Sequence, residues 1–115
     1  MHLQEKKYKE AVKAFTKSLQ QNKMNYDAYF YRGVTHLDSG LPEKAILDLN
    51  ELTQICPDYR KTMFIVLSIA YRRVNDFTSA LWTLSRAIMK YPKYIEAYIA
   101  RGQIFIFQKK WEKAL

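Results

Sequence analysis

Apolar side chains recur along this chain every three or four residues, the spacing that lines one face of an α-helix. Short polar or proline-containing stretches interrupt the pattern at regular points, where helices are expected to end. The pattern therefore predicts an all-α chain. The predicted helices cover residues 8–21, 26–38, 42–55, about 60–73, 77–90 and about 94–108, with residues 1–5 as the tail of an earlier helix and a further helix starting at Lys110.

The turns between these helices contain residue types that end and begin helices. Gly40 suits a left-handed cap after the helix that ends at Asp38. Pro42 follows at a first helical turn, where a missing amide proton has no cost. Asp76 suits the N-cap of the helix that starts at Phe77. These signals predict hairpins of two antiparallel helices joined by a short turn.

Two segments argue locally for β-strands. Residues 64–69 and 104–107 are rich in β-branched and aromatic side chains. The equivalent stretch 30–37, however, contains Arg32 and Gly33 between helical flanks. A helix that is apolar nearly all round is also what a layer packed on both sides requires. We therefore predict helix in all three stretches.

An internal repeat of 34 to 35 residues runs through the whole chain. Five series of similar residues show this spacing: Ala11/Ala45/Ala80/Ala114, Tyr29/Phe64/Tyr98, Gly33/Ser68/Gly102, His36/Tyr71/Phe105 and Pro57/Pro92. One extra residue near Arg60 accounts for every interval of 35. A repeat of this length indicates stacked supersecondary units. We predict a single domain over 1–115, made of a partial repeat 1–25, repeats 26–59 and 61–94, and a partial repeat 95–115.

The order of large and small residues resembles the tetratricopeptide repeat family. In that family a large aromatic is followed by a small residue and then another aromatic, as in Tyr29/Gly33/His36, Phe64/Ser68/Tyr71 and Tyr98/Gly102/Phe105. An aromatic three residues before a small residue opens the second helix in Tyr8/Ala11, Phe77/Ala80 and Trp111/Ala114. The resemblance implies a right-handed α-solenoid of antiparallel helix hairpins. Four positions depart from the family pattern: Lys23, His36, Pro42 and Leu52.

The resemblance also implies a binding surface, the concave groove that the first helices of successive units line. It places ten residues there: Phe30, Val34, Leu37, Ile65, Ile69, Arg72, Arg73, Ile99, Gln103 and Ile106. Most are apolar, and an exposed apolar stripe usually marks an interaction site. We expect a protein–protein interaction scaffold within a multi-subunit assembly, whose groove takes an apolar helix or an extended segment. The expected anchors are Phe30, Ile65, Ile69 and Ile99.

Two alternatives concern the same groove. The chain's own later repeats or a terminal helix would fill it if the superhelix is tight. The clamp that some family members use for acidic chaperone tails needs Lys and Asn on the first helices, because carboxylates require fixed donors. This chain has mainly apolar residues at those positions, so we do not expect such a clamp within these repeats.

The net charge of +8 is distributed unevenly. The first 25 residues and the stretch from Arg60 to Lys93 are basic, whereas the stretch from Asp27 to Asp58 is acidic. A basic surface attracts acidic partners over long range, so acidic protein tails (for example cytoskeletal ones) and RNA are alternative partners. RNA is disfavoured because the groove-facing residues are aliphatic rather than polar. A lysine-rich helix face that is simply solvated gives the same charge pattern.

Candidate catalytic side chains are few. His36 takes the place of an aromatic packing residue, His2 lies near the start of the chain, and the single cysteine, Cys56, precedes a proline at a helix end. The sequence has no Gly-rich phosphate loop, no paired-carboxylate cleft and no Cys/His metal spacing. We therefore expect no enzymatic activity, no cofactor and no metal.

Our expectations for the cellular location and the completeness of this chain rest on features that its sequence lacks. It contains no run of about 18 uncharged apolar residues, so we expect no membrane span. Because a single cysteine forms no internal disulfide, we expect an intracellular, cytoplasmic protein, with a cytoskeletal or ciliary assembly left open. Both end units are incomplete and have no polar capping helix. We expect a fragment of a longer array, or else ends covered by neighbouring subunits.

Overall fold

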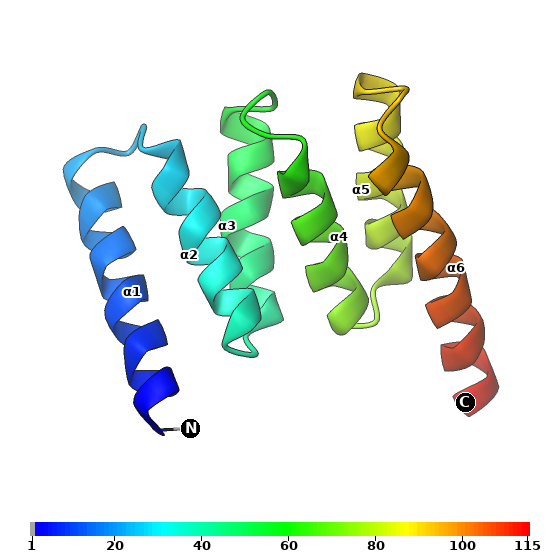
Figure 1. Ribbon diagram of the computed structural model, residues 1–115, viewed down its shortest axis with the longest axis horizontal. Helices are drawn as coiled ribbons and strands as arrows, with labels where there is room; N and C mark the ends of the chain where they lie inside the picture. Colours follow the sequence, from blue (N-terminus) through cyan, green and yellow to red (C-terminus); the bar gives the residue numbers. More distant parts are fainter. Residues whose placement is uncertain (1) are drawn as a thin grey trace. The chain divides into compact units, whose positions relative to one another are not determined.

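The computed structural model describes residues 2–115, with side chains described from residue 4 onward. These residues form six α-helices and no strand: α1 (His2–Gln21), α2 (Tyr26–Asp38), α3 (Pro42–Ile55), α4 (Thr62–Arg73), α5 (Phe77–Lys90) and α6 (Ile95–Ala114). The chain divides between Tyr59 and Arg60 into two compact units. The N-terminal unit contains α1–α3 and the C-terminal unit contains α4–α6. Within each unit, consecutive helices run antiparallel (Figure 1).

The turn chemistry confirms the predicted boundaries between α2 and α5. Gly40 has a φ of 82°, in the left-handed region, and Pro42 is the first residue of α3. The carboxylate of Asp76 accepts a hydrogen bond from the backbone N–H of Ser79, at 3.1 Å, and so caps α5. Among α2 to α5, only α4 differs from its predicted bounds by more than one residue: it begins at Thr62 rather than at Arg60.

The core of the N-terminal unit lies between α2 and α3. Leu49 and Leu52 of α3 are fully buried, and Leu37 of α2 is 5% exposed. At the crossing, a Cβ placed on Gly33 would lie 2.8 Å from Cγ of Leu49. Only glycine therefore permits this separation of the two helices, as the small-residue series predicts.

The C-terminal unit has the same arrangement with a larger apolar content. Met63 and Leu67 of α4 are fully buried, as is Leu84 of α5. Ser68, at the position of Gly33, is also buried, and its hydroxyl donates to the carbonyl of Ile65 at 2.7 Å. The β-rich stretch 64–69 is thus helical, as the repeat predicts and local propensity does not.

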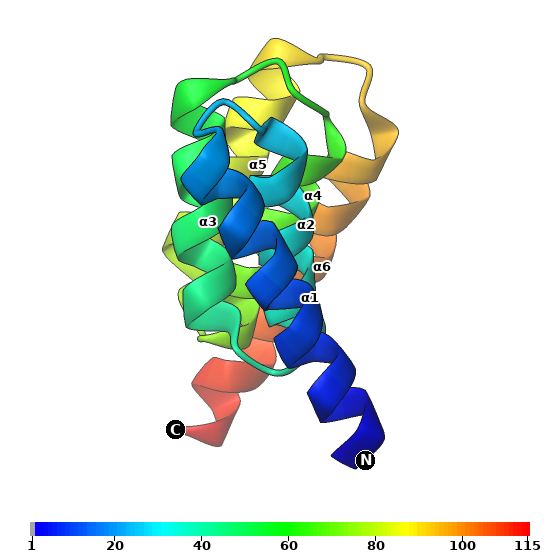
Figure 2. The same cartoon turned by 90° about the vertical axis from the view of Figure 1, so that its left-hand side faces the viewer.

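The predictions for the two outer helices are wrong in one respect. Residues 2–5 do not belong to a separate helix, since α1 is continuous for 20 residues. Likewise α6 does not end at Gln108 but continues for 20 residues to Ala114. The first turns of α1 and the last turns of α6 extend past the neighbouring interhelical turn in both views (Figures 1 and 2). The reason is local: both stretches consist of Lys, Glu, Gln and other good helix formers, without the Gly or Asn–Asp signals of the other turns.

The close approach of α2 and α3 is testable with two glycine substitutions. Gly33→Ala forces a methyl group against the fully buried Leu49, and overpacking of this kind costs about 1–3 kcal/mol. A gain in helix propensity of about 1 kcal/mol offsets only part of this. We expect a lower free energy of unfolding, measured by urea denaturation.

The matched control is Gly102→Ala in α6, where nothing lies within 4 Å of the added methyl group. Only the propensity gain operates there, so stability rises by about 0.5–1 kcal/mol in dilute solution. Equal responses at the two positions would contradict the assigned crossing at Gly33.

Candidate protein-binding site

The N-terminal unit buries most of its predicted groove residues. Phe30 is 7% exposed, and its ring lies 5.6 Å from that of Tyr59, centroid to centroid. Leu37 is also buried, whereas Val34 is half-buried. The hydroxyl of Tyr59 donates to the carboxylate of Asp27, which holds the tyrosine over α2. Of the three groove residues predicted on α2, Val34 has the most exposed surface.

In the C-terminal unit, the predicted groove residues belong to α4 and α6, two helices that are in direct contact, and we call these residues the α4/α6 surface. Ile65 and Ile69 of α4 are half-buried. Ile99 and Ile106 of α6 are 56% and 57% exposed. With the exposed Gln103, they follow one face of α6, because residues four and three apart lie on the same side of a helix. This α4/α6 surface is the largest part of the predicted site that one unit contains.

A cationic group borders the α4/α6 surface at the end of α4. The guanidinium of Arg72 lies over the ring of Phe107, 4.2 Å from its centroid. Burial lowers the pKa of Arg72, and the neighbouring charge of Arg73 lowers it further. Both arginines are in the last turn of α4, where positive charge also complements the helix dipole. The surface therefore combines aliphatic side chains with cations at one end.

A polar cluster joins the three helices of the N-terminal unit. Arg32 of α2 donates from Nε and Nη2 to the two carboxylate oxygens of Asp48 in α3, at 2.8 and 2.6 Å. Its Nη1 donates to the hydroxyl of Thr16 in α1, at 3.2 Å. The bond to Asp48 raises the pKa of Arg32, against the opposing effect of burial. A bidentate pair of this kind fixes the register of α2 on α3.

His36 lies beside this cluster and is itself buried. Its Nε2 is 3.9 Å from Oδ2 of Asp48, and its Nδ1 has no hydrogen-bond partner. Burial lowers the pKa of His36, and although Asp48 opposes this effect, the cations Lys44 and Arg32 reinforce it. The imidazole is therefore neutral near pH 7 and packs at an aromatic position of the repeat.

Sequence analysis did not find the Arg32–Asp48 pair. A signal was present, since Asp48 takes a position where the other second helices have Ala14 and Thr83, on the face that packs against a first helix. A carboxylate on an otherwise apolar face predicts a buried partner. Arg32, one position before Gly33, lies on the facing helix.

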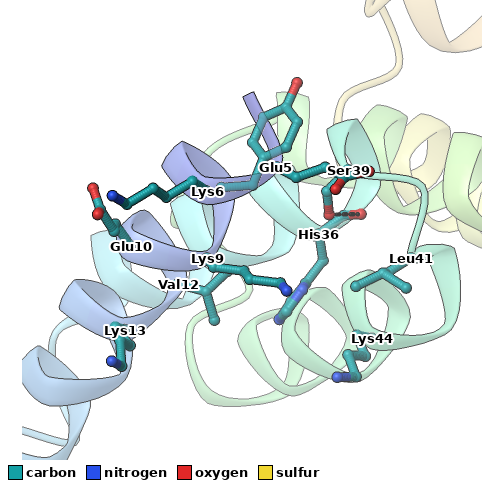
Figure 3. A pocket seen from close by; sticks show the side chains of 11 residues that line it. Glu5, Lys6, Lys9, Glu10, Val12, Lys13, His36, Ser39, Leu41 and Lys44 are labelled. Carbon is teal, nitrogen blue, oxygen red and sulfur yellow. Dashed lines mark hydrogen bonds between the residues drawn. The ribbon is translucent and has the colours of Figure 1, made fainter. Parts of the chain in front are cut away.

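A cleft with a volume of about 840 Å³ opens in the N-terminal unit between α1 and the turn that joins α2 to α3. Side chains of α1 border it on one side, and those of His36, Ser39, Leu41 and Lys44 border it on the other (Figure 3). Four of the lining residues are lysines and two are glutamates: Lys6, Lys9, Lys13, Lys44, Glu5 and Glu10. The cleft is thus basic, with apolar walls at Val12 and Leu41.

The remaining candidates for chemistry lie apart from one another. Cys56 is half-buried at the C-terminal end of α3, where its N–H donates to the carbonyl of Leu52 at 2.9 Å. The side chain of His2 lies outside the described residues. Among the residues that the structure describes, no group of three or more His, Cys, Asp or Glu side chains could hold a metal ion. Within the same range, no helix combines the length and apolar character needed to cross a membrane.

Comparison with known proteins identifies the family. A model of the tetratricopeptide repeat matches residues 2–60, just over half of the 115-residue chain. The chain belongs to the tetratricopeptide repeat family. A search of curated protein sequences gave no match.

Solved structures agree with this family. Two crystal structures of MamA are similar, with TM-scores of 0.79 and 0.77, 25% sequence identity in each case, and coverage of 93% and 88% of this chain. The chain spans 62% and 55% of the length of those MamA chains. The fold is therefore an all-α helical repeat solenoid. Tetratricopeptide repeats of this kind are protein-interaction scaffolds and are typically non-catalytic, and this chain is a scaffold in that general sense.

The burial of His36 gives a pH dependence. Because the pKa of His36 is below its usual value of 6.5, the unfolded chain binds this proton more readily than the folded one. The stability contribution is fully present above about pH 6.5 and is lost as the pH falls below it. We expect His36→Phe, which restores the aromatic of the family pattern, to remove this part of the acid sensitivity.

The measurement is urea unfolding of both proteins at about pH 7.5 and about pH 5.5. His2 is present in both proteins, so the difference between them isolates His36. An identical pH dependence in the variant would show that His36 is protonated equally in both states.

Proposed function

We propose that the protein binds an apolar helix or extended segment of a partner protein on the α4/α6 surface, as one component of a multi-subunit assembly. The observation that carries the proposal is that Ile99 and Ile106 of α6 are each more than half exposed, while Ile65 and Ile69 are half-buried on α4, the helix in contact with α6. Covering an exposed isoleucine contributes about 1.5–3 kcal/mol. Two such anchors therefore supply most of the affinity of a modest interface, with Arg72 and Gln103 as its polar edge.

The proposed surface is confined to the C-terminal unit. Phe30 and Leu37 are already covered within their own unit, which leaves Val34 as the accessible residue. The proposed anchors are accordingly Ile65, Ile69, Ile99 and Ile106. The competing proposal is that the protein's own chain fills the groove. It predicts that no added peptide binds to these four side chains. Because a single cysteine forms no internal disulfide, we place this scaffold in the reducing cytoplasm.

The test uses peptides selected from a displayed library for binding to the protein. We expect the selected sequences to carry apolar residues at helical or alternating spacing, and Ile99→Asp combined with Ile106→Asp to weaken their binding at least about tenfold. Fluorescence anisotropy with the labelled peptides measures the change. Circular dichroism verifies that the double variant remains folded.

The matched control is Met89→Asp, which alters an apolar side chain that is 80% exposed on α5 of the same unit. It should leave peptide affinity unchanged. Selected peptides that bind the double variant as tightly as the original protein would contradict the proposal, as would peptides without apolar anchors.

A second candidate function rests on the basic cleft between α1 and the α2–α3 turn. Its four lysines outnumber its two glutamates, so it suits the carboxylates of an acidic protein tail. The apolar wall at Val12 and Leu41 suits a protein segment better than it suits RNA, whose bases need aromatic or polar partners.

For this candidate, the probe is a labelled oligo-glutamate peptide. We expect the charge-removing pair Lys9→Gln and Lys44→Gln to weaken its binding several-fold, and added salt to weaken binding to the unaltered protein. Lys23→Gln with Lys93→Gln removes the same charge at exposed sites outside the cleft. Equal losses in both pairs would mean that net charge, rather than the cleft, attracts the peptide.

A further inference from the structure

Helix α5 carries two large apolar side chains on the side opposite its core. The helix packs against α4 and α6, and its residues Ala80 and Leu84 are fully buried. Because an α-helix has about 3.6 residues per turn, Trp82 and Met89 lie together on the other side. Trp82 is 64% exposed and Met89 is 80% exposed. Together with Arg86, one turn after the tryptophan, they form what we call the α5 face.

The other second helices do not share this pair of apolar side chains. In α1, the repeat positions of Trp82 and Met89 hold Lys13 and Gln20, which are polar and exposed. In α3, the position of Trp82 holds Leu47, which is 71% exposed although α4, α5 and α6 follow it in the chain. The exposure of this position is therefore a property of the repeat. Two large apolar side chains there form a patch of the kind that marks an interaction site.

The charge beside this position separates α5 from α3. Glu43 and Glu51 lie one turn before and one turn after Leu47. At the same repeat positions, α5 has Thr78 and Arg86. An exposed apolar side chain is thus flanked by carboxylates in α3 and by a cation in α5. Partners of opposite charge are therefore expected for the two helices.

Further positive charge borders the α5 face. Lys90 is in the last turn of α5, Lys93 follows shortly after the helix, and both are exposed. The guanidinium of Arg86 lies 5.7 Å from the ring centroid of Phe64 in α4, a contact that holds it in place. Helix α5 itself contains no Asp or Glu, and Asp76 caps its opposite end. The face therefore suits carboxylates.

We propose that the α5 face binds an acidic amphipathic helix of a partner protein. Trp82 and Met89 are seven residues apart, about two helical turns, which matches apolar residues at i and i+7 of a second helix packed along α5. Carboxylates beside those residues would pair with Arg86 and Lys90. Tryptophan, methionine and arginine are also enriched at the centres of protein interfaces.

A protein helix fits this face better than an anionic membrane does. Segments that bind anionic lipid contain clusters of about four to eight cations, often together with a continuous apolar face. The α5 face has two large apolar side chains, and Thr78 and Ser85 lie on the same side of the helix. These short polar side chains limit the apolar area to what one partner helix covers. The α5 face shares no residue with the α4/α6 surface, so the proposal does not depend on peptide binding there.

The experiment selects helical peptides from a displayed library on the full chain that carries Ile99→Asp and Ile106→Asp. This background lacks the anchors of the α4/α6 surface, so failure of that site does not affect the result. We expect the selected peptides to be acidic, with apolar residues at i and i+7, and added salt to weaken their binding. Basic or uncharged peptides would overturn the proposal, as would a selection that yields no binding sequence.

The affinities of labelled peptides, measured by fluorescence anisotropy, locate the site. Trp82→Gln combined with Met89→Gln should weaken binding at least about tenfold, and Lys90→Glu should weaken it several-fold. The matched control is Leu47→Gln, which removes an exposed apolar side chain at the repeat position of Trp82 and should leave the affinity unchanged. All four side chains are exposed, and circular dichroism verifies that the variants fold. Acidic peptides that bind equally well without Trp82 and Met89 would contradict the assigned face.

Two further measurements test other occupants of the α5 face. The proteins with and without the Trp82→Gln and Met89→Gln pair should bind phosphatidylserine vesicles equally. They should also give the same mass by sedimentation velocity in the absence of peptide. A loss of vesicle binding in the variant would assign the face to a lipid surface, and a loss of self-association would assign it to a second copy. Either result would overturn the proposal.

Discussion

The close approach of each first helix to the following second helix determines the rest of this structure. At Gly33 the two helices are separated by little more than the side chain of Leu49. Large aromatic and aliphatic residues then fill the space on either side of the crossing, since protein interiors are packed without voids. A small residue, the buried Ser68, takes the position of Gly33 in α4, and the crossing recurs there between α4 and α5. The hairpin, and not the single helix, is therefore the unit that repeats.

The two units complete this crossing with different chemistry. In the C-terminal unit, Leu67 and Thr83 are buried at the positions that hold Arg32 and Asp48 in the N-terminal unit. Leu67 gains from burial alone and the hydroxyl of Thr83 donates to the carbonyl of Ser79 in its own helix, whereas a buried ion pair must first overcome desolvation. The ion pair adds a directional constraint, because it also engages Thr16 of α1. The N-terminal unit thus orders three helices through one guanidinium group, while the C-terminal unit depends on apolar contacts.

Sequence analysis predicted the hairpins well because their ends have local causes. The left-handed Gly40, Pro42 at a first turn and the Asp76 cap each act within a few residues, so a single sequence contains the information. The merging of residues 2–5 into α1 and the extension of α6 were missed for a related reason. Repeat symmetry predicts a turn at each of these places, but the local residues favour helix. Without a turn signal, propensity prevails.

The site was less predictable than the fold, because exposure depends on distant residues. The family pattern placed Phe30 and Ile99 at equivalent positions, yet Tyr59 covers Phe30 while Ile99 is more than half exposed. Tyr59 belongs to the connection that contains the extra residue of the repeat, and its contact with α2 spans some thirty positions. No local pattern encodes such a contact. Predicted groove residues therefore become candidates for binding only after their neighbours in space are known.

The distribution of apolar surface on α6 bears on the proposed contact with a partner segment. Residues 97 and 104 are buried within the unit and mark the face of α6 that packs there. Ile99 and Ile106 occupy a second face, and Tyr98, Gly102 and Phe105 occupy a third. A helix with apolar residues on every face is stable in water only when more than one neighbour covers it. The second face is aliphatic, whereas the third has a glycine and two aromatics. The aliphatic chemistry of the second face, rather than its area, therefore supports the proposal that this face binds a partner segment.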